Sequence, residues 1–320
     1  MRISAGRYEA EILSYGATLA DLRIPVGQKS RSVVLGPANV SDYPRHKAFM
    51  GAIAGRCANR IAGGRIVLDG SRYQLSLNEQ ERTHLHGGFN GFFNRDWEII
   101  ASGGDHVSLS LLSPDGEEGY PGEVRATCRY HLAPDGILSI LLSAVTTAPT
   151  LVNLATHSYF NLADSDTILD HVLTIPAEHY TPVDGNLVPT GEITPVAATG
   201  FDFRKPAAIS AQRVRVHGGF DHNFALGGGP TDVPKLAAKL ESPDREVALE
   251  IWSTEPGLQF YDGQYLPIPF AMRGRAAHRF GGCCLEPQRF PDAINHPHFP
   301  QCTLRPGETY RQLTQYRFAS

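Results

Sequence analysis

Alternation of apolar and polar residues with a period of two runs along most of the chain, and it limits the possible folds more than any other feature. Residues 107–111 alternate before the turn Pro114-Asp115-Gly116, and residues 129–132 lead through Pro134-Asp135-Gly136 into residues 137–142. Alternate side chains of a strand point to opposite faces, and such turns join consecutive strands. No long segment has a clean 3.6-residue repeat. The pattern predicts a mostly antiparallel β structure.

Further strands and loops follow the same pattern. Residues 65–68 and 72–75 flank Asp69-Gly70-Ser71, which predicts a hairpin, and residues 248–252 predict another strand. The 32 glycines and 23 prolines separate these runs, and residues 227–232 are typical of a surface loop.

The chain has no linker, composition shift or repeat that would divide it. It contains 320 residues, of which 42% are hydrophobic and 19% charged, as expected for a globular protein with a large core. Sandwiches of ~250 residues often form one domain, so length alone does not require two. We predict an all-β fold, a large antiparallel β-sandwich that forms a single domain over residues 1–320.

Charge and cysteine content indicate a cytoplasmic protein that binds neither nucleic acid nor membranes. The net charge of -4 leaves no basic surplus to neutralise phosphates or acidic lipids. The N-terminus lacks an apolar signal segment, and no apolar run reaches the ~20 residues that span a bilayer. The five cysteines show no CxxC spacing, which favours reduced thiols, and the adjacent Cys283 and Cys284 are expected to be small buried side chains.

Glu286 is a candidate catalytic base. It lies in the apolar, proline-containing segment of residues 284–295, where apolar neighbours would raise the pKa of its carboxyl group toward the working pH. A structural, salt-bridged glutamate is the alternative, because ion pairs also perturb carboxylates.

Asn59 and Arg60 lie in a segment of small residues that includes Arg56. An arginine offers several donors and an asparagine amide both donates and accepts, which suits the hydroxyls of a sugar. A solvated turn remains the alternative. The glycines here form no GxGxxG or Walker pattern, which argues against nucleotide binding.

His84 and His86 are expected to face the same side of a strand, since they are two residues apart. This spacing occurs in metal sites, but no close glutamate follows and no HExxH motif is present. We therefore favour acid chemistry or hydrogen bonding over a metal. Gly87 and Gly88 would let the backbone approach a ligand closely, which favours His86 as the site residue.

His157 lies among Thr156, Ser158 and Asn161, which are expected to fix its tautomer. The alternative is a core histidine whose hydrogen bonds are all satisfied. Together with the candidate base Glu286, which is distant in sequence, His157 becomes a candidate acid.

Two other segments suggest sugar binding. One contains Asp221, and the other contains Gln259 beside Phe260 and Tyr261. Carboxylates and amides bind hydroxyls and aromatic rings stack on pyranoses, although a turn aspartate and core aromatics explain these residues equally well.

Taken together, the sequence resembles the aldose 1-epimerases, also called galactose mutarotases. The matching segments are residues 12–19, 55–61, 85–88, 118–122, 153–162, 220–224, 256–261, 285–286 and 290–293. The resemblance implies a galactose mutarotase-like β-sandwich that uses neither cofactor nor metal. It also implies Glu286 as general base, His157 as general acid and His86 as a second active-site histidine.

By the same resemblance, Asn59, Arg60, Asp221 and Gln259 would bind the sugar. The base would remove the proton of the C1 hydroxyl while the protonated acid donates to the ring oxygen. Ring opening, rotation about C1–C2 and reclosure would interconvert the α and β anomers of a free hexose such as galactose or glucose. Each proton transfer contributes about 10²- to 10⁴-fold.

Some positions depart from the family pattern. Thr156, preceded by Ala155, stands before His157 where the family commonly has Asn. Pro287 follows Glu286 where Thr is common, and Asp262-Gly263-Gln264 replaces the more usual Thr-Gly-Asn. Proline removes a backbone donor beside the base.

Three alternative functions remain. A phosphorylated or modified sugar is an alternative substrate if Arg56, Arg60 and Arg289 converge. A non-catalytic sugar-binding sandwich and a metal enzyme using His84 and His86 are the other two.

Overall fold

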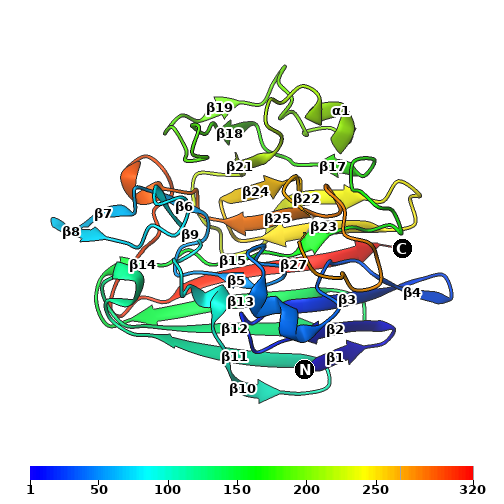
Figure 1. Cartoon of the computed structure of the whole chain (residues 1–320), viewed down its shortest axis with the longest axis horizontal. Coiled ribbons are helices and arrows are strands. Elements are labelled where there is room, and N and C mark those ends of the chain that lie inside the picture. Colours follow the sequence, from blue (N-terminus) through cyan, green and yellow to red (C-terminus); the bar gives the residue numbers. More distant parts are fainter. Residues whose placement is uncertain (267, 320) are drawn as a thin grey trace.

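Strands dominate the computed structural model, which describes residues 1–266 and 268–319 (Figure 1). Within these ranges α1 (Ile209–Arg213) is the one α-helix. The short 3-10 helices are η1 (Val40–Arg45), η2 (Phe92–Asn94), η3 (Glu117–Gly119) and η4 (Ala293–Asn295). The predicted all-β class is confirmed.

The largest sheet has nine strands, all paired in antiparallel fashion. In spatial order they are β10 (Glu98–Ser102), β11 (His106–Ser113), β12 (Val124–Leu132), β13 (Leu138–Thr146), β27 (Tyr310–Ala319), β23 (Ala248–Ser253), β22 (Lys235–Glu241), β17 (Val172–Thr174) and β20 (Ala207–Ala208). The C-terminal strand β27 lies between β13 and β23 and thereby joins two halves of the sheet that are distant in sequence (Figure 1). The strands predicted at residues 107–111, 129–132, 137–142 and 248–252 are confirmed within β11, β12, β13 and β23.

Two smaller sheets pack on this one. The six-stranded sheet has the order β16 (Tyr159–Phe160), β25 (Cys283–Gln288), β24 (Gly257–Tyr261), β21 (Asp221–Ala225), β18 (His179–Thr181) and β19 (Thr194–Pro195). The four-stranded sheet has the order β1 (Arg2–Ala5), β2 (Tyr8–Ile12), β3 (Leu19–Val26) and β4 (Lys29–Ser32). One buried apolar cluster includes Leu22 of the four-stranded sheet, Ile140 of the nine-stranded sheet and Phe260 of the six-stranded sheet. The shared core explains the sandwich, because each sheet buries one apolar face against another.

Short strand pairs complete the framework. They are β5 (Ile53–Ala54) with β15 (Ala155–Thr156), β6 (Arg60–Ala62) with β9 (Thr83–Leu85), β7 (Arg65–Leu68) with β8 (Ser71–Gln74), and β14 (Thr150–Leu151) with β26 (Thr303–Leu304). The predicted hairpin is confirmed as β7 and β8, with a two-residue turn at Asp69 (φ 50°) and Gly70 (φ 82°). Positive φ at both turn positions matches the twist of a tight hairpin.

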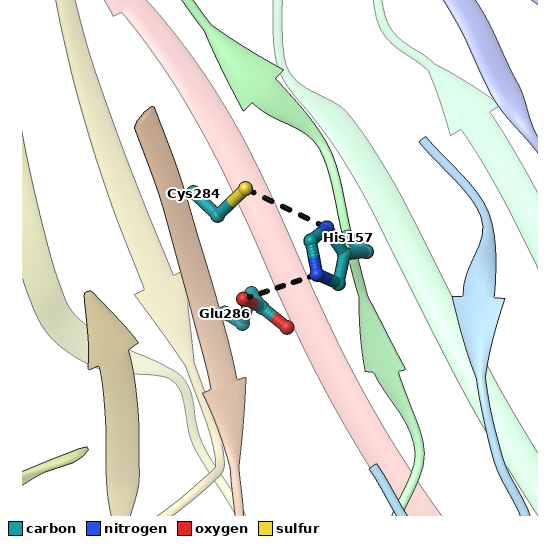
Figure 2. A group of neighbouring side chains, drawn as sticks. All are labelled: His157, Cys284 and Glu286. Atoms are coloured by element: carbon teal, nitrogen blue, oxygen red, sulfur yellow. Dashed lines mark hydrogen bonds and ion pairs between the residues drawn. The ribbon is translucent and has the colours of Figure 1, made fainter. Parts of the chain in front are cut away.

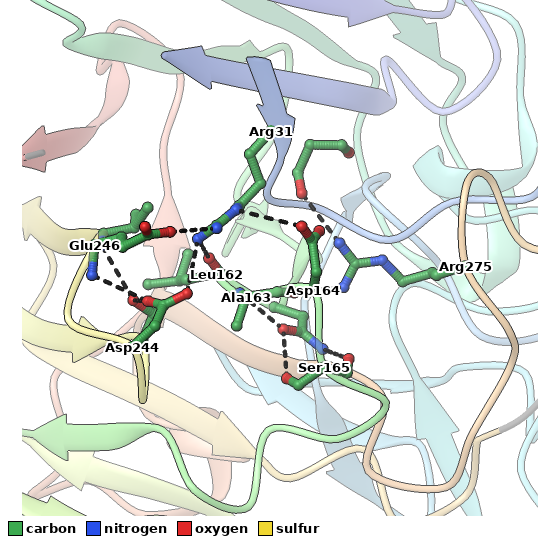
Figure 3. A network of polar contacts seen from close by, with 12 residues as sticks. Arg31, Leu162, Ala163, Asp164, Ser165, Asp244, Glu246 and Arg275 are labelled. Atoms are coloured by element: carbon green, nitrogen blue, oxygen red, sulfur yellow. Dashed lines mark hydrogen bonds and ion pairs between the residues drawn. The ribbon is translucent and has the colours of Figure 1, made fainter. Parts of the chain in front are cut away.

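Arg31, which is partly buried, connects the N-terminal sheet to the rest of the molecule (Figure 3). Arg31 of β4 donates to the carbonyl of Leu162 at 3.0 Å, and it also contacts Asp244 at 3.3 Å and Glu246 at 2.6 Å. The Arg31 side chain is only 12% exposed, but Asp244 and Glu246 are 38% and 51% exposed, so water still screens the two ion pairs. Arg31 therefore links β4 to the loop after β16 and to the turn between β22 and β23.

The remaining sequence expectations concern a loop and the thiols. Residues 227–232 lie in the connection between β21 and β22, as predicted. Cys283 and Cys284 are both fully buried, which confirms their prediction as small interior side chains, and neither is in a disulfide. Across the described ranges, no helix has the length and apolar character needed to cross a bilayer.

Candidate active site

All seven predicted site residues line one cleft of about 530 Å³. They are Asn59, Arg60, His86, His157, Asp221, Gln259 and Glu286. A larger hollow of about 630 Å³ lies beside Arg289 and Tyr310, but none of the seven lines it. The convergence of polar side chains, rather than size, identifies the first cleft as the candidate site.

Three neighbouring strands form the floor of this cleft. Glu286 of β25 lies opposite Gln259 of β24, which lies opposite Asn223 of β21. Asp221 is two residues before Asn223, so its side chain shares that face of the sheet with Gln259 and Glu286. The intervening Leu258, Phe260 and Leu285 belong to the apolar core. The period-two pattern therefore places the polar groups in the cleft.

Glu286 and His157 face each other on the cleft floor (Figure 2). The Oε1 atom of Glu286 lies 3.8 Å from Nε2 of His157, which the loop between β15 and β16 carries. The two residues are 2% and 5% exposed. The Oε2 atom of Glu286 is buried and has no hydrogen-bond partner among the described residues.

Burial shifts both groups toward their uncharged forms. It raises the pKa of Glu286 well above 4.5, an effect that the nearby charge of Asp221 increases and that of Arg60 opposes. Burial lowers the pKa of His157 to about 4, although its backbone hydrogen bond and the Asp221 charge favour the imidazolium. Without a bound sugar, burial therefore shifts the pair toward a carboxylic acid and a neutral imidazole.

A network of charged and amide groups borders this pair. The guanidinium of Arg60 donates to Glu79 at 2.8 and 2.9 Å and contacts Asp221 at 3.3 Å. Gln259 donates through Nε2 to Asp221 at 2.6 Å, while its Oε1 is buried without a partner in the described chain. The side-chain oxygen of Asn59 accepts the backbone N–H of Arg60 at 2.8 Å, which leaves the amide nitrogen to donate to a ligand.

The prediction that His84 and His86 share a strand face is wrong. Strand β9 ends at Leu85, and His86 follows it with φ 52°, so the two rings diverge. His84 contacts the carbonyl of Ser76 and the hydroxyl of Tyr120, each at 2.7 Å, and is a satisfied core residue. His86 lines the cleft, where its Nδ1 accepts the backbone N–H of Asn59 at 3.1 Å. Burial lowers its pKa well below 6.5.

Two supporting arguments from the sequence are also wrong. A Cβ atom on Gly87 would lie 1.7 Å from the carbonyl oxygen of Gly55, so this glycine is needed for backbone packing and not for ligand approach. Thr156 contacts the hydroxyl of Tyr316 at 2.8 Å, and Asn161 donates to the carbonyls of Ser165 and Gly281, so neither orients His157.

The thiol of Cys284 contacts His157 instead. Its Sγ atom lies 3.5 Å from Nδ1 of the imidazole (Figure 2). The sequence could not show this contact, because a buried cysteine in an apolar strand has the same pattern whether it meets core or cleft. Phe49 was missed as well; its ring lies 4.6 Å from that of His86 and 5.6 Å from that of His157.

Glu79 and Tyr159 complete the residues that sequence reasoning missed. Glu79 lies in a short polar run that is typical of a solvated turn, yet it holds Arg60. The ring of Tyr159 in β16 lies 5.3 Å from that of His157.

The arginines needed for a phosphate pocket do not converge. Arg56 is buried elsewhere and donates to Ser113 and to the carbonyls of Pro114 and Gly122. Arg289 pairs with Glu255 at 3.1 Å beside the larger hollow.

Comparison with known proteins identifies the family of this site. The family model for aldose 1-epimerase matches residues 1–317. The chain belongs to the aldose 1-epimerase family. Enzymes of this family are isomerases, and the chain is accordingly an isomerase of this type.

Relatives match almost the whole chain. A galactose mutarotase of Rattus norvegicus is 41% identical over 326 residues, covering 99% of this chain and 93% of that protein. An aldose 1-epimerase of Escherichia coli K12 is 39% identical over 316 residues, covering 96% of this chain and 91% of that protein. A solved aldose epimerase homologue from C. elegans has a TM-score of 0.92 at 29% identity and covers 100% of this chain and 98% of its own. The galactose mutarotase-like sandwich predicted from the sequence is confirmed.

Proposed function

We propose that this aldose 1-epimerase interconverts the α and β anomers of a free hexose such as galactose or glucose, with Glu286 as base and His157 as acid. The observation that carries the proposal is the buried pair itself, 3.8 Å apart, with one carboxylate oxygen unpartnered on the floor of a sugar-sized cleft. Both groups are within reach of a single anomeric centre, which is the geometry that general acid–base catalysis requires.

The reaction moves two protons and breaks one bond. The C1 hydroxyl gives its proton to the carboxylate of Glu286, the C1–O5 bond breaks as C1 becomes a carbonyl carbon, and O5 takes a proton from Nε2 of His157. Rotation about C1–C2 exposes the other face of the aldehyde. O5 then attacks C1, the carbonyl oxygen regains a proton from Glu286, and His157 recovers its own. The second anomer leaves and the side chains return to their starting state.

This cycle needs the proton of the pair on His157, whereas burial favours it on Glu286 before a sugar binds. A bound sugar would reverse that preference, because its C1 hydroxyl donates to the carboxylate and its ring oxygen accepts from the imidazolium. Hydrogen bonds to charged forms stabilise them. The charge of Asp221 favours the imidazolium and that of Arg60 favours the carboxylate.

The remaining polar groups would hold the sugar hydroxyls. Arg60 and the amide nitrogen of Asn59 are donors, Asp221 is an acceptor, and Gln259 contributes its unpartnered Oε1 as an acceptor. His86 offers Nε2, since its Nδ1 already accepts from the backbone. Phe49 beside His86 and His157 supplies an apolar wall. We also propose that residues 1–320 form a single domain, and that the protein is cytoplasmic and does not bind nucleic acid.

Polarimetry on freshly dissolved α-D-galactose and α-D-glucose, with and without EDTA, tests the activity. We expect faster approach to the equilibrium rotation, and EDTA should not slow it because the proposed proton transfers use only side chains. The same assay with Glu286→Gln, combined with calorimetric measurement of galactose affinity, separates an enzyme from a binding module. Unaccelerated rotation of both sugars by the unmodified protein would contradict the proposal.

A further inference from the structure

The thiol of Cys284 adds a third metal-binding group to the two residues proposed for catalysis. One ligand atom each from His157, Cys284 and Glu286 can be chosen so that all lie within 4.8 Å of one another (Figure 2). All three residues are buried, and they are the one His/Cys/Asp/Glu group with such spacing in the described ranges. From these contacts, we propose that His157, Cys284 and Glu286 bind a thiophilic divalent cation such as Zn²⁺, which inhibits the enzyme.

Strand geometry places the thiol and the carboxylate on one side. Cys284 and Glu286 are two residues apart in β25, so their side chains project from the same face toward His157. Cys283 points the other way and belongs to the main apolar core, whereas Cys284 packs in a separate cluster with Tyr159 and Tyr261. The two adjacent cysteines therefore lie on opposite faces of β25, and only Cys284 is on the side of His157.

The distances fit a tetrahedral ion after small movements. Zinc binds sulfur at about 2.3 Å and nitrogen or oxygen at about 2.0–2.2 Å, which places two ligand atoms of one ion roughly 3.4–3.6 Å apart. The Cys284 Sγ atom already lies 3.5 Å from Nδ1 of His157. No two of the three ligand atoms are more than 4.8 Å apart, so movements of about 1 Å suffice, which rotation of the side chains can provide. The unpartnered Oε2 of Glu286 loses no hydrogen bond in the described structure by such a movement.

Charge balance favours a divalent ion in this buried place. The thiol and the carboxylic acid release their protons to solvent, and the resulting thiolate and carboxylate neutralise the two positive charges of the cation, with a neutral imidazole as third ligand. An uncharged complex avoids the desolvation cost of a net charge. A thiolate and an imidazole favour Zn²⁺ or Cd²⁺ over Mg²⁺, which prefers oxygen ligands. Water from the cleft, which His157 and Glu286 line, would be the fourth ligand.

Inhibition follows from the overlap with the proposed function, on which this consequence rests; cation binding itself does not depend on it. A cation held by Glu286 removes the base from the sugar. An imidazole that binds the cation through Nδ1 cannot take up the second proton that makes His157 an acid. Galactose and the cation should therefore compete for the cleft.

Titration with Zn²⁺ and with Co²⁺ tests the site in two independent ways. Polarimetry in chelator-free buffer measures the concentration of Zn²⁺ that halves the rate, and near-ultraviolet absorption detects the thiolate-to-cobalt charge-transfer band. We expect inhibition that added galactose relieves, a cobalt band, and no inhibition by Mg²⁺. The Cys284→Ala variant should need at least about 100-fold more Zn²⁺, because even the loss of a group that only supports a ligand costs 10–100-fold.

The matched control is Cys283→Ala, which removes the adjacent thiol on the opposite strand face and should keep both inhibition and band. Equal Zn²⁺ sensitivity of the Cys284→Ala variant and the unmodified protein, or a cobalt band that persists in this variant, would overturn the proposal. If the unmodified protein shows no mutarotation, the cobalt band still decides whether the cation binds, so the two proposals fail separately.

Discussion

Arg56 and Arg60 are four residues apart and nearly equally buried, yet they belong to regions with opposite properties. Arg56 is 2% exposed and donates to neutral oxygens, among them the carbonyls of Ser113, Pro114 and Gly122. Arg60 is 8% exposed and is held by the carboxylates of Glu79 and Asp221 at the cleft. The first region fixes the chain with hydrogen bonds, while the second assembles charge beside a ligand space.

The cleft floor differs from the Arg56 region in what it leaves unpaired. Oε2 of Glu286 and Oε1 of Gln259 are buried without partners within the described chain. A buried polar atom without a hydrogen bond costs about 1–3 kcal/mol, so such atoms need a compensating role. A sugar hydroxyl would supply the missing bond. Buried atoms without partners also occur outside the cleft, at Glu255 and Gln288 for example, so what sets the cleft floor apart is that two such oxygens face one ligand space.

Replacing Glu286 with glutamine should give the largest effect. Loss of the base is expected to lower kcat by about 10²- to 10⁴-fold, measured by polarimetry. The variant should be no less stable than the unmodified protein. In the unmodified protein the pKa of Glu286 is raised by folding, so the stability associated with its uncharged form is present below pH 4.5 and is lost as the pH rises through the raised pKa. Glutamine cannot ionise and avoids that loss. A melting temperature at pH 8 well below that of the unmodified protein would show a structural role instead.

The exchange of Arg56 for lysine tests the scaffold. Lysine cannot reproduce the fork of donors to Ser113, Pro114 and Gly122, so we expect a loss of about 3 kcal/mol in the free energy of unfolding, measured in urea. The rate per folded molecule should remain unchanged.

Arg60→Lys is the matched variant. Lysine keeps the positive charge beside Glu79 and Asp221 and loses only part of the hydrogen bonding, so the variant should cost about 1 kcal/mol of stability but raise KM about 10-fold by weakening the sugar-binding network. If both variants lose the same stability and the same affinity, the contrast between the two regions is wrong.

The sequence predicts these two regions unequally. The period of two and the Asp-Gly turns indicate the strands and the β7–β8 hairpin, because local side-chain direction and turn conformation are encoded in neighbouring residues. The polar floor is different: Asp221, Gln259 and Glu286 come together only through strand pairing, and their assignment depended on family resemblance. The sequence does not reveal the divergence of His84 and His86, because it follows from a positive φ at His86, and few residues other than glycine adopt one.

Asp221→Asn should shift the pH dependence of the cleft. The negative charge of Asp221 raises the pKa of Glu286, so its removal should move the acidic limb of kcat/KM to lower pH while the limb stays above pH 4.5 because burial persists. KM should rise about 10-fold through the lost acceptor. The control Glu79→Gln also removes a negative charge from Arg60, but Glu79 does not contribute to the shift at Glu286. An equal displacement of the limb in both variants would argue against direct coupling of Asp221 to Glu286.

Pro287→Thr should give the smallest effect, although Pro287 is adjacent to the proposed base. Strand β16 pairs only with Cys283 and Cys284 of β25, so at Pro287 the described structure has a paired strand, β24, on one side only. The carbonyl of Pro287 accepts a hydrogen bond from Gln312 at 2.7 Å. Proline is tolerated where a strand lacks one neighbour. The substitution should lower stability by about 0.4–1 kcal/mol through the freer unfolded chain and leave kcat unchanged, as measured by thermal unfolding and polarimetry. A large loss of kcat would instead mean that the ring of Pro287 positions Glu286. The hydrogen-bonded framework and the cleft floor would then be coupled along β25.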